Sequence, residues 1–390
     1  MNRPRRVVST AAVVLFAALW PGAPTGAATA PPAAASAVTV GPPILAVAGA
    51  GASALSGTGR FIAYEVFDPG GHARLLRKDR ATGVTKILNR NIDGGVAGGR
   101  YSQPPVISSD GRRIAFVSSA ARLVPDDTNG RFDAFVRDAA TDSTILVSRA
   151  FNGGSSNADS GSISLSKNGR YAVFISRGTD LVPGSTTTNA DVYRRDLTTG
   201  TTQQVTLRPD GSPSRGPGAS AGVISADGRL VAFASYNTDL TPVDGQDQEA
   251  DLFVRDLTTG RTRWLSPNLP VGADPSGVVL SPDGRWVCTR WADGSLHLTN
   301  VATATTIQVT SEGFAETGTF TANGRLLVYI SANKAYLRDL TTGIDTELGT
   351  PAGGAAHGIS ISADGTLAAF DWVAFDGSQS GIYTVTLSAP

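Results

Sequence analysis

The sequence predicts an all-β protein, a single β-propeller of about seven four-stranded blades. A short turn motif recurs at quasi-regular spacing, and each copy is followed by strands with the same pattern of apolar and aromatic residues. No segment shows sustained 3.6-residue amphipathic periodicity. The chain has 390 residues with 45 glycines and 22 prolines, which is typical of a turn-rich β-protein.

The first thirty residues are expected to be a signal peptide that lies outside the fold. Met1 to Arg6 is basic, Val7 to Trp20 is almost wholly apolar, and Ala28-Thr29-Ala30 fits a small-residue cleavage site. The apolar run is too short to cross a hydrocarbon core of ~30 Å, and no later run is long enough. We therefore expect export to the periplasm or the extracellular space, with no transmembrane segment in the mature chain, residues 31–390.

Charge and cysteine content exclude several classes of protein. The formal net charge is zero, and the basic leader contributes to it, so the mature chain is weakly acidic. It therefore lacks the basic footprint of a nucleic-acid binder, and we expect no nucleic-acid partner. The single cysteine, Cys288, cannot form an internal disulfide and is interpreted as an inert core thiol.

Six repeats carry a turn centred on Asx-Gly, as in Ser-Ser-Asp-Gly-Arg at 108–112 and Ser-Ala-Asp-Gly-Arg at 225–229, and the first repeat has the degenerate copy Ser-Gly-Thr-Gly-Arg at 56–60. Asx-Gly is typical of two-residue hairpins in which both central residues have positive φ, so we predict that turn type here. The blade turns are expected at seven glycines: Gly59, Gly111, Gly169, Gly228, Gly284, Gly324 and Gly365.

The strands after each turn repeat as well. The second strand carries an aromatic residue at the fifth position after the turn glycine, such as Phe116, between apolar neighbours, which predicts burial on both faces. The third strand has the pattern of Asp133 to Asp138, and its Arg-Asp ending is interpreted as a structural ion pair or turn cap. A Thr-Gly turn and a fourth strand complete the blade. The fifth repeat departs most, because Thr289 stands at its aromatic position.

The last repeat supplies only three strands and ends at Ile382 to Leu387. Ala37 to Val40, which precede the first repeat, are predicted to provide the missing fourth strand. This pairing would close the ring and remove an open sheet edge.

These repeats resemble the TolB-type propeller family, whose unit runs Ser-x-Asp-Gly, an apolar strand ending in an aromatic residue, Asp-apolar-Phe/Tyr-apolar-x-Asp, and Thr-Gly. The resemblance covers residues 55–390 and implies a rigid exported scaffold that works through binding. The α/β domain that precedes the propeller of TolB is not expected within residues 31–54. The role of TolB in envelope integrity is therefore not carried over.

No catalytic residues are predicted. Gly218 to Gly222 matches the Gly-x-Ser-x-Gly motif of serine hydrolases, but a loop precedes it and a strand is expected after it, where the hydrolase elbow needs a helix. His72, His297 and His357 show no triad spacing. An extracellular hydrolase or lyase with its site at the channel mouth remains the alternative, and converging His, Glu and Asp side chains would favour it.

Two loops between second and third strands carry acidic side chains. Six residues in the loops of blades 2 and 4 are candidate binding residues: Asp127, Asn129, Asp133, Asp244, Asp247 and Asp251. The first three surround a glycine and offer the hard oxygen ligands that calcium prefers. No bidentate glutamate follows, so we favour a polar loop with a strand-initiating aspartate over a metal site, and we predict no cofactor.

Loop lengths predict where binding occurs. Tight turns gather on one face of the propeller, and three long loops, 120–132, 178–190 and 237–250, emerge on the other. Long loops on a rigid scaffold are where function concentrates, which favours a binding face over blades 2 to 4. We expect a monomeric, non-catalytic scaffold that binds a protein or a glycan at the cell exterior.

Overall fold

A computed structural model describes residues 38–67, 72–101, 103–185, 188–242, 249–267, 270, 272–311 and 315–388. The expected signal peptide and Ala37 lie outside these residues. No helix in the described part of the chain is long and apolar enough to cross a membrane.

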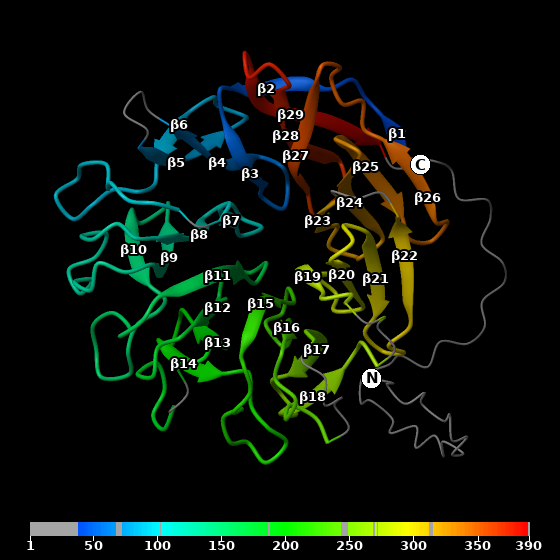
Figure 1. Ribbon diagram of the computed structural model, residues 1–390. Coiled ribbons are helices and arrows are strands. Elements are labelled where there is room, and N and C mark those ends of the chain that lie inside the picture. The colour runs from blue at the N-terminus through cyan, green and yellow to red at the C-terminus, as the bar shows by residue number, and fades with distance from the viewer. Residues whose placement is uncertain are drawn as a thin grey trace, which may run out of the picture. The chain divides into compact units, whose positions relative to one another are not determined.

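Seven sheets follow one another in chain order around a common axis (Figure 1). Blade 1 consists of β3 (Gly51–Leu55), β4 (Phe61–Phe67), β5 (Ala73–Asp79) and β6 (Thr85–Ile87), and blade 2 of β7 (Val106–Ile107), β8 (Arg113–Ser118), β9 (Asp133–Asp138) and β10 (Ser143–Leu146). Blade 3 consists of β11 (Ser160–Leu165), β12 (Tyr171–Ser176), β13 (Asp191–Asp196) and β14 (Thr201–Gln204), and blade 4 of β15 (Ala219–Ile224), β16 (Leu230–Ser235), β17 (Asp251–Asp256) and β18 (Arg261–Trp264).

The remaining sheets complete the ring. Blade 5 consists of β19 (Ser276–Leu280), β20 (Trp286–Arg290), β21 (Leu296–Asn300) and β22 (Thr306–Thr310), and blade 6 of β23 (Glu316–Phe320), β24 (Leu326–Ser331), β25 (Lys334–Asp339) and β26 (Ile344–Glu347). Blade 7 combines β27 (Gly354–Ile361), β28 (Leu367–Ala374) and β29 (Ser380–Ser388) with β1 (Thr39–Val40) and β2 (Ile44–Ala48). The predicted fold class, a seven-bladed propeller of four-stranded blades, is confirmed.

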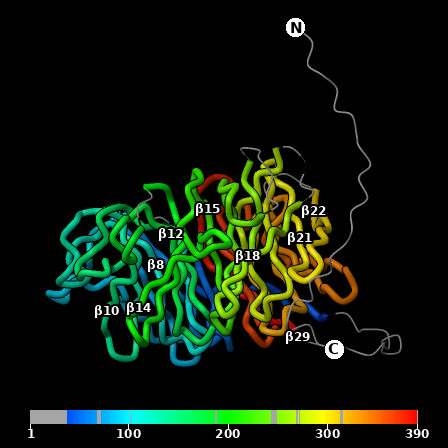
Figure 2. The backbone as a smooth tube through the Cα atoms, turned by 90° about the horizontal axis from the view of Figure 1, so that it is seen from below, coloured from blue at the N-terminus to red at the C-terminus, as the bar shows by residue number. Residues whose placement is uncertain are grey.

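The first strand of each blade is the innermost, and first strands of neighbouring blades contact one another. Seen from the side, the ring is a disc (Figure 2). All strands within a blade pair antiparallel. The turns between first and second strands, and between third and fourth strands, therefore share one face, here called the turn face. The longer loops and the connections between blades share the opposite face, here called the loop face.

The Asx-Gly turns differ from the predicted type. Only the glycine has positive φ, +70° at Gly111, and Asp110 does not. Gly111 N donates to Ser108 O at 2.9 Å, which closes a four-residue turn. The Asp110 carboxylate accepts from Ser108 Oγ at 2.5 Å and from the amide of Arg112 at 2.9 Å. The motif thus forms a turn held by its own side chains, with glycine at the left-handed position, rather than a two-residue hairpin.

The turn glycines also allow close packing between blades. A Cβ on Gly111 would lie 2.1 Å from the ring of Phe61 in the preceding blade. Arg77 stacks on the same ring at 4.4 Å from its centroid. Gly57 N donates to Ser109 O at 2.8 Å, which joins the turns of blades 1 and 2. Glycine is needed at these turns both for its conformation and for its lack of a side chain.

The Arg-Asp ends of the third strands are structural, as expected. Asp138 binds Nε of Arg112, the residue after the turn glycine, at 2.9 Å, and accepts from the amide of Ala140 at 3.0 Å. In blade 3 the hydrogen bond from Arg170 lowers the pKa of Asp196 to about 2. Each of these aspartates therefore links the turn between the first two strands of its blade, through the arginine, to the turn between the last two, through the backbone amide.

The core lies between the blades, and aromatic pairs mark it. In five blades the aromatic residue of the second strand faces one in the third strand, with ring centroids 5.5–6.0 Å apart: Phe116–Phe135, Phe174–Tyr193, Phe233–Phe253, Tyr329–Tyr336 and Phe370–Tyr383. Residues on both sides of these strands are buried, which confirms the predicted double-sided burial. Cys288 is a free, buried thiol, and burial raises its pKa to about 12.

The N-terminal segment closes the ring, and more of it takes part than was predicted. Thr39 and Val40 pair with Ser388 and Leu387 at one end of β29. The next strand, β2, pairs with the other end of β29, from Thr384 to Gly381. Two prolines separate β1 from β2, and proline has no amide hydrogen to donate to the sheet. The closing strand is thus split in two.

Candidate functional site

The long loops of blades 2 to 4 form part of the core. Each loop places one leucine, Leu123, Leu181 or Leu240, in the same buried cluster as the aromatic pair of its blade. These leucines are at most 3% exposed. The loops therefore cover the aromatic pairs at the loop face, and their length serves packing as well as any binding role.

The connections between blades brace these loops. Asp180, in the loop of blade 3, accepts from Ser156 Oγ and from the amide of Asn157, both at 3.1 Å. Asp239, in the loop of blade 4, accepts from Arg208 Nε at 2.8 Å and from the amide of Arg215 at 3.0 Å. The loop face over blades 2 to 4 is thus a set of mutually bonded hairpins.

Asp127, Asn129 and Asp133 lie together in the loop of blade 2. Asn129 Nδ2 donates to Asp133 Oδ2 at 2.9 Å, while its Oδ1 accepts from the amide of Arg131 at 2.8 Å. The side-chain amide of Asn129 therefore points its NH2 group, not its oxygen, toward Asp133. Ser148 Oγ donates to the other Asp133 oxygen at 2.6 Å.

Burial perturbs both carboxyls of this loop. It raises the pKa of Asp133 to about 6, against the hydrogen bonds from Ser148 and Asn129, and it raises the pKa of Asp127. Asp127 is 5% exposed, and its Oδ1 has no hydrogen-bond partner. Of these three side chains only Asp127 therefore has an unpartnered oxygen, and the preference for a polar loop over a calcium site stays a prediction.

In blades 3 and 4 as well, the aspartate that starts the third strand accepts a hydrogen bond from a side-chain hydroxyl. Asp191 and Asp251 accept from Thr206 Oγ1 at 2.6 Å and from Ser266 Oγ at 2.7 Å. The hydroxyl of Ser266 also accepts from the amide of Leu252 at 2.8 Å. This recurrence indicates a structural role for Asp251. The other two candidates in blade 4, Asp244 and Asp247, lie outside the described residues.

Sequence reasoning missed a group of titratable side chains on the first and second strands of blades 6, 7 and 1: Glu65, Glu316, His357 and Asp371, here called the inner acid group. His357 Nδ1 lies 3.3 Å from Glu316 Oε1, and the amide of Gly358 donates to Glu316 Oε2 at 2.9 Å. Asp371, opposite His357 in the sheet, accepts from Ser53 Oγ at 2.5 Å. The group lies toward the loop-face end of these first and second strands.

Glu65 and Asp371 are buried acids. Burial and the nearby Asp371 raise the pKa of Glu65 to about 7. Burial raises the pKa of Asp371 to about 6, although Ser53 donates hydrogen bonds that oppose the shift. Glu65 is 8% exposed, and its Oε1 has no hydrogen-bond partner. An unsatisfied buried carboxyl destabilises a fold, so this one needs an explanation.

The repeat shows that the fold does not require these acids. Glu65 and Asp371 are each the sixth residue after a turn glycine, and the same position holds Val117, Ile175 and Ile330 in blades 2, 3 and 6. Those three side chains are buried. Aligning the repeats by their turns, then asking which apolar positions carry an acid, would have found this pair from the sequence.

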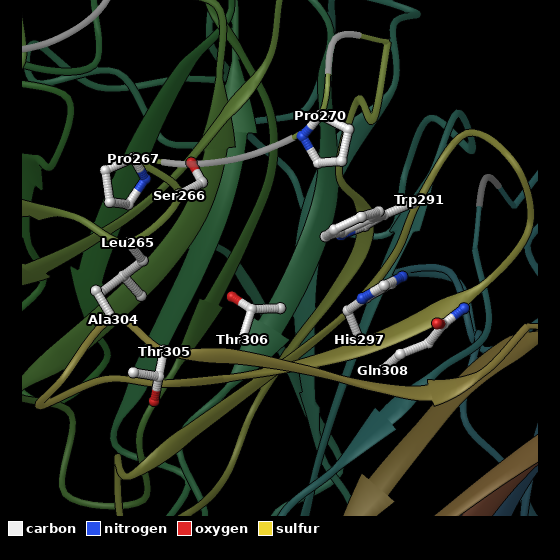
Figure 3. Close-up of a pocket in the computed structure, with 10 residues that line it drawn as sticks. All are labelled: Leu265, Ser266, Pro267, Pro270, Trp291, His297, Ala304, Thr305, Thr306 and Gln308. Carbon is white, nitrogen blue, oxygen red and sulfur yellow. The ribbon is translucent and has the colours of Figure 1, made fainter.

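A cleft of about 510 Å³ opens between blades 4 and 5 (Figure 3). Its walls include three residues of the connection between the blades and three of blade 5: Leu265, Pro267, Pro270, Trp291, His297 and Gln308. Trp291 and His297 lie on one side of the cleft, and Leu265 and Pro267 lie on the other (Figure 3). Sequence analysis gave these residues no role.

Trp291 and His297 stack, with ring centroids 3.3 Å apart and planes 5° from parallel. His297 Nε2 lies 2.8 Å from Ser295 Oγ, and Ser295 Oγ donates its hydrogen to Asp293. Because the hydroxyl has only one hydrogen, Nε2 must be the donor to Ser295. Burial lowers the pKa of His297, so the ring is neutral and Nδ1 is an acceptor.

Comparisons with solved structures find the same fold. Oligogalacturonate lyase from Vibrio parahaemolyticus superposes with a TM-score of 0.56 at 12% identity, over 90% of this chain and 91% of that chain. An oligogalacturonate lyase in complex with manganese superposes with a TM-score of 0.55 at 14% identity, over 86% and 88%. TolB from Acinetobacter baumannii gives a TM-score of 0.43 at 16% identity, over 84% of this chain and 80% of that chain. The two lyase superpositions show the propeller fold alone.

Sequence comparisons add no family. No family model matches the chain, and no curated protein matches its sequence. The described part of the chain contains no group of three or more His, Cys, Asp or Glu side chains placed to hold a metal ion.

Proposed function

We propose that the chain is an exported, non-catalytic propeller that binds a protein or a glycan at the cell exterior. The observation that carries the proposal is that the loops on the loop face differ from one blade to the next. Braced loops rise over blades 2 to 4, and a cleft opens where blade 5 has only a tight turn from Trp291 to Ser295. The turn face, by contrast, repeats the same bonded turn around the ring.

Two exposed apolar side chains support a binding role for the loop face. Ile92 and Phe151 stand at equivalent places in the connections before blades 2 and 3, and they are 51% and 58% exposed. Their amides donate to Arg122 O and Asp180 O, at 2.9 and 2.8 Å. Rigidly held apolar side chains at hairpin tips are typical of protein-binding surfaces.

Affinity capture from native cell-surface and culture extracts tests the proposal. The bait is the mature chain, and the matched control is the double variant I92S/F151S. Shortening the loops would be a poor control, because it would remove the leucines that cover the core. Recovery of the chain outside the cell with an N-terminus near residue 31 would support export. A partner held by wild type and lost by the control would support binding through the loop face.

Equal capture by both baits would move the binding surface away from these two hairpins. Retention of the whole chain in the cytoplasm would contradict export. No saturable binding to any protein or glycan would contradict the proposed function itself.

One observation favours a second candidate, an extracellular hydrolase or lyase. The inner acid group places a buried pair with raised pKa values, Glu65 and Asp371, beside a histidine and a further carboxylate. Perturbed acids of this kind cluster at catalytic sites. Cleavage of neutral or uronic-acid oligosaccharides, abolished in D371N, would establish this candidate in place of the first.

A further inference from the structure

Blade 5 departs from the repeat at the place where other blades bury an aromatic pair. Thr289 faces His297 at the register position that Phe116 and Phe135 occupy in blade 2. The loop leucine that covers the pair in blades 2 to 4 has no counterpart in the tight turn of blade 5. The third-strand ring of this blade is therefore left beside a cleft instead of inside a packed loop.

Trp291 covers the histidine in place of that leucine. One indole face stacks on the His297 ring, whose own position is fixed by the hydrogen bond to Ser295. The indole is only partly buried, and it borders the cleft (Figure 3). The stack holds a large flat apolar surface at the cleft wall. Because the indole is already held in place, little of its side-chain entropy is lost when a ligand binds.

The polar groups around this surface are neutral. His297 is 6% exposed, and its Nε2 is engaged by Ser295, which leaves Nδ1 as the acceptor of the ring. Gln308 and Thr306 add an amide and a hydroxyl from the neighbouring strand. None of the described lining residues carries a charge.

The corresponding groove between blades 1 and 2 has a different character. It is smaller, about 370 Å³, and the loop residues Leu123 and Pro125 form one wall. Its lining includes the charged residues Arg90, Arg137 and Asp142. The uncharged aromatic cleft is thus a feature of blade 5 and not a general property of the grooves between blades.

We infer that the cleft between blades 4 and 5 binds a neutral saccharide unit. The apolar C–H face of a pyranose ring packs on the exposed part of the Trp291 indole. Its hydroxyls donate to His297 Nδ1 and exchange hydrogen bonds with Gln308. An anionic sugar would lack a counter-charge among the described lining residues. The inference rests on the proposed binding function and names one ligand class and one site for it.

The test measures binding of the full exported chain to neutral and anionic oligosaccharides. A glycan array selects ligands, and titration calorimetry with the selected glycan and with hexagalacturonate gives the affinities. We expect saturable binding of a neutral glycan, at least tenfold weaker in W291A and several-fold weaker in Q308A. The control W286A removes a tryptophan from the turn-face end of the same blade and should bind as wild type does. Gln308 is exposed, so we expect Q308A to fold and to test the site even if W291A does not fold.

Several outcomes would overturn the inference. They are unchanged neutral-glycan affinity in both W291A and Q308A, preference for hexagalacturonate, or no neutral glycan bound on the array. If the loop-face capture still succeeds in the last case, the proposed function stands and only this site fails. Binding of a proline-rich peptide alone, sensitive to W291A, would assign the cleft to a protein ligand instead.

Discussion

Glu65 gives the sharpest physical prediction. Its pKa rises from 4.5 to about 7 in the folded chain, so the folded state holds the proton more tightly than the unfolded state. The stability that this proton confers is fully present below pH 4.5 and is lost as the pH rises through about 7. Since one pKa unit corresponds to ~1.4 kcal/mol, the loss approaches ~3 kcal/mol at pH 8. For a chain of this size that is about 4 °C in melting temperature.

Glu65→Leu should remove this dependence, because other blades place Val117 or Ile330 at the same position without strain. Thermal unfolding at pH 4 to 8 is the assay. The variant should gain ~3 kcal/mol over wild type between these limits. Glu347→Gln, an exposed glutamate, is the control and should parallel wild type. If E65L also parallels wild type, Glu65 is not held protonated, and the argument for a buried acid pair fails.

Three further predictions follow from the fold. Deleting residues 37–47 should lower the melting temperature by many degrees, because it opens the edge of β29; an unchanged melt would contradict ring closure by this segment. Gly111→Ala should destabilise by roughly 2–4 kcal/mol in denaturant unfolding, since its Cβ meets Phe61, whereas Gly83→Ala, with φ of +74° and open space, should lose only about 1 kcal/mol. Calcium should not raise the melting temperature above a chelator control, and a rise that Asp127→Ala abolishes would establish a metal site.

The fold was predictable because its signal is local and repeated. The Asx-Gly turns are held by hydrogen bonds among their own residues, so each can be recognised from a few residues of sequence. The aromatic residue five positions after the turn glycine marks a core site for the same reason. The turn type was wrong because the sequence shows a glycine with positive φ but not the conformation of the aspartate before it.

The candidate site was harder to predict because it depends on departures from the repeat. Long loops indicated a binding face, yet burial of Leu123 and Leu240 shows that part of their length serves the core. The cleft forms because blade 5 lacks the long loop and its buried leucine. Trp291 stacks on His297 only because the short turn of the folded blade brings the two rings together. The pairing of Glu65 with Asp371 joins residues from opposite ends of the chain, which only ring closure brings together.

The central claim is that this propeller binds its ligand without transforming it. Native mass spectrometry of the exported chain, followed over hours with neutral and uronic-acid oligosaccharides, tests the claim most directly. We predict an intact neutral-glycan complex whose ligand mass stays constant and which W291A forms at least tenfold more weakly. Shortened or unsaturated products that appear with wild type and disappear in D371N would contradict the account and make the protein an enzyme.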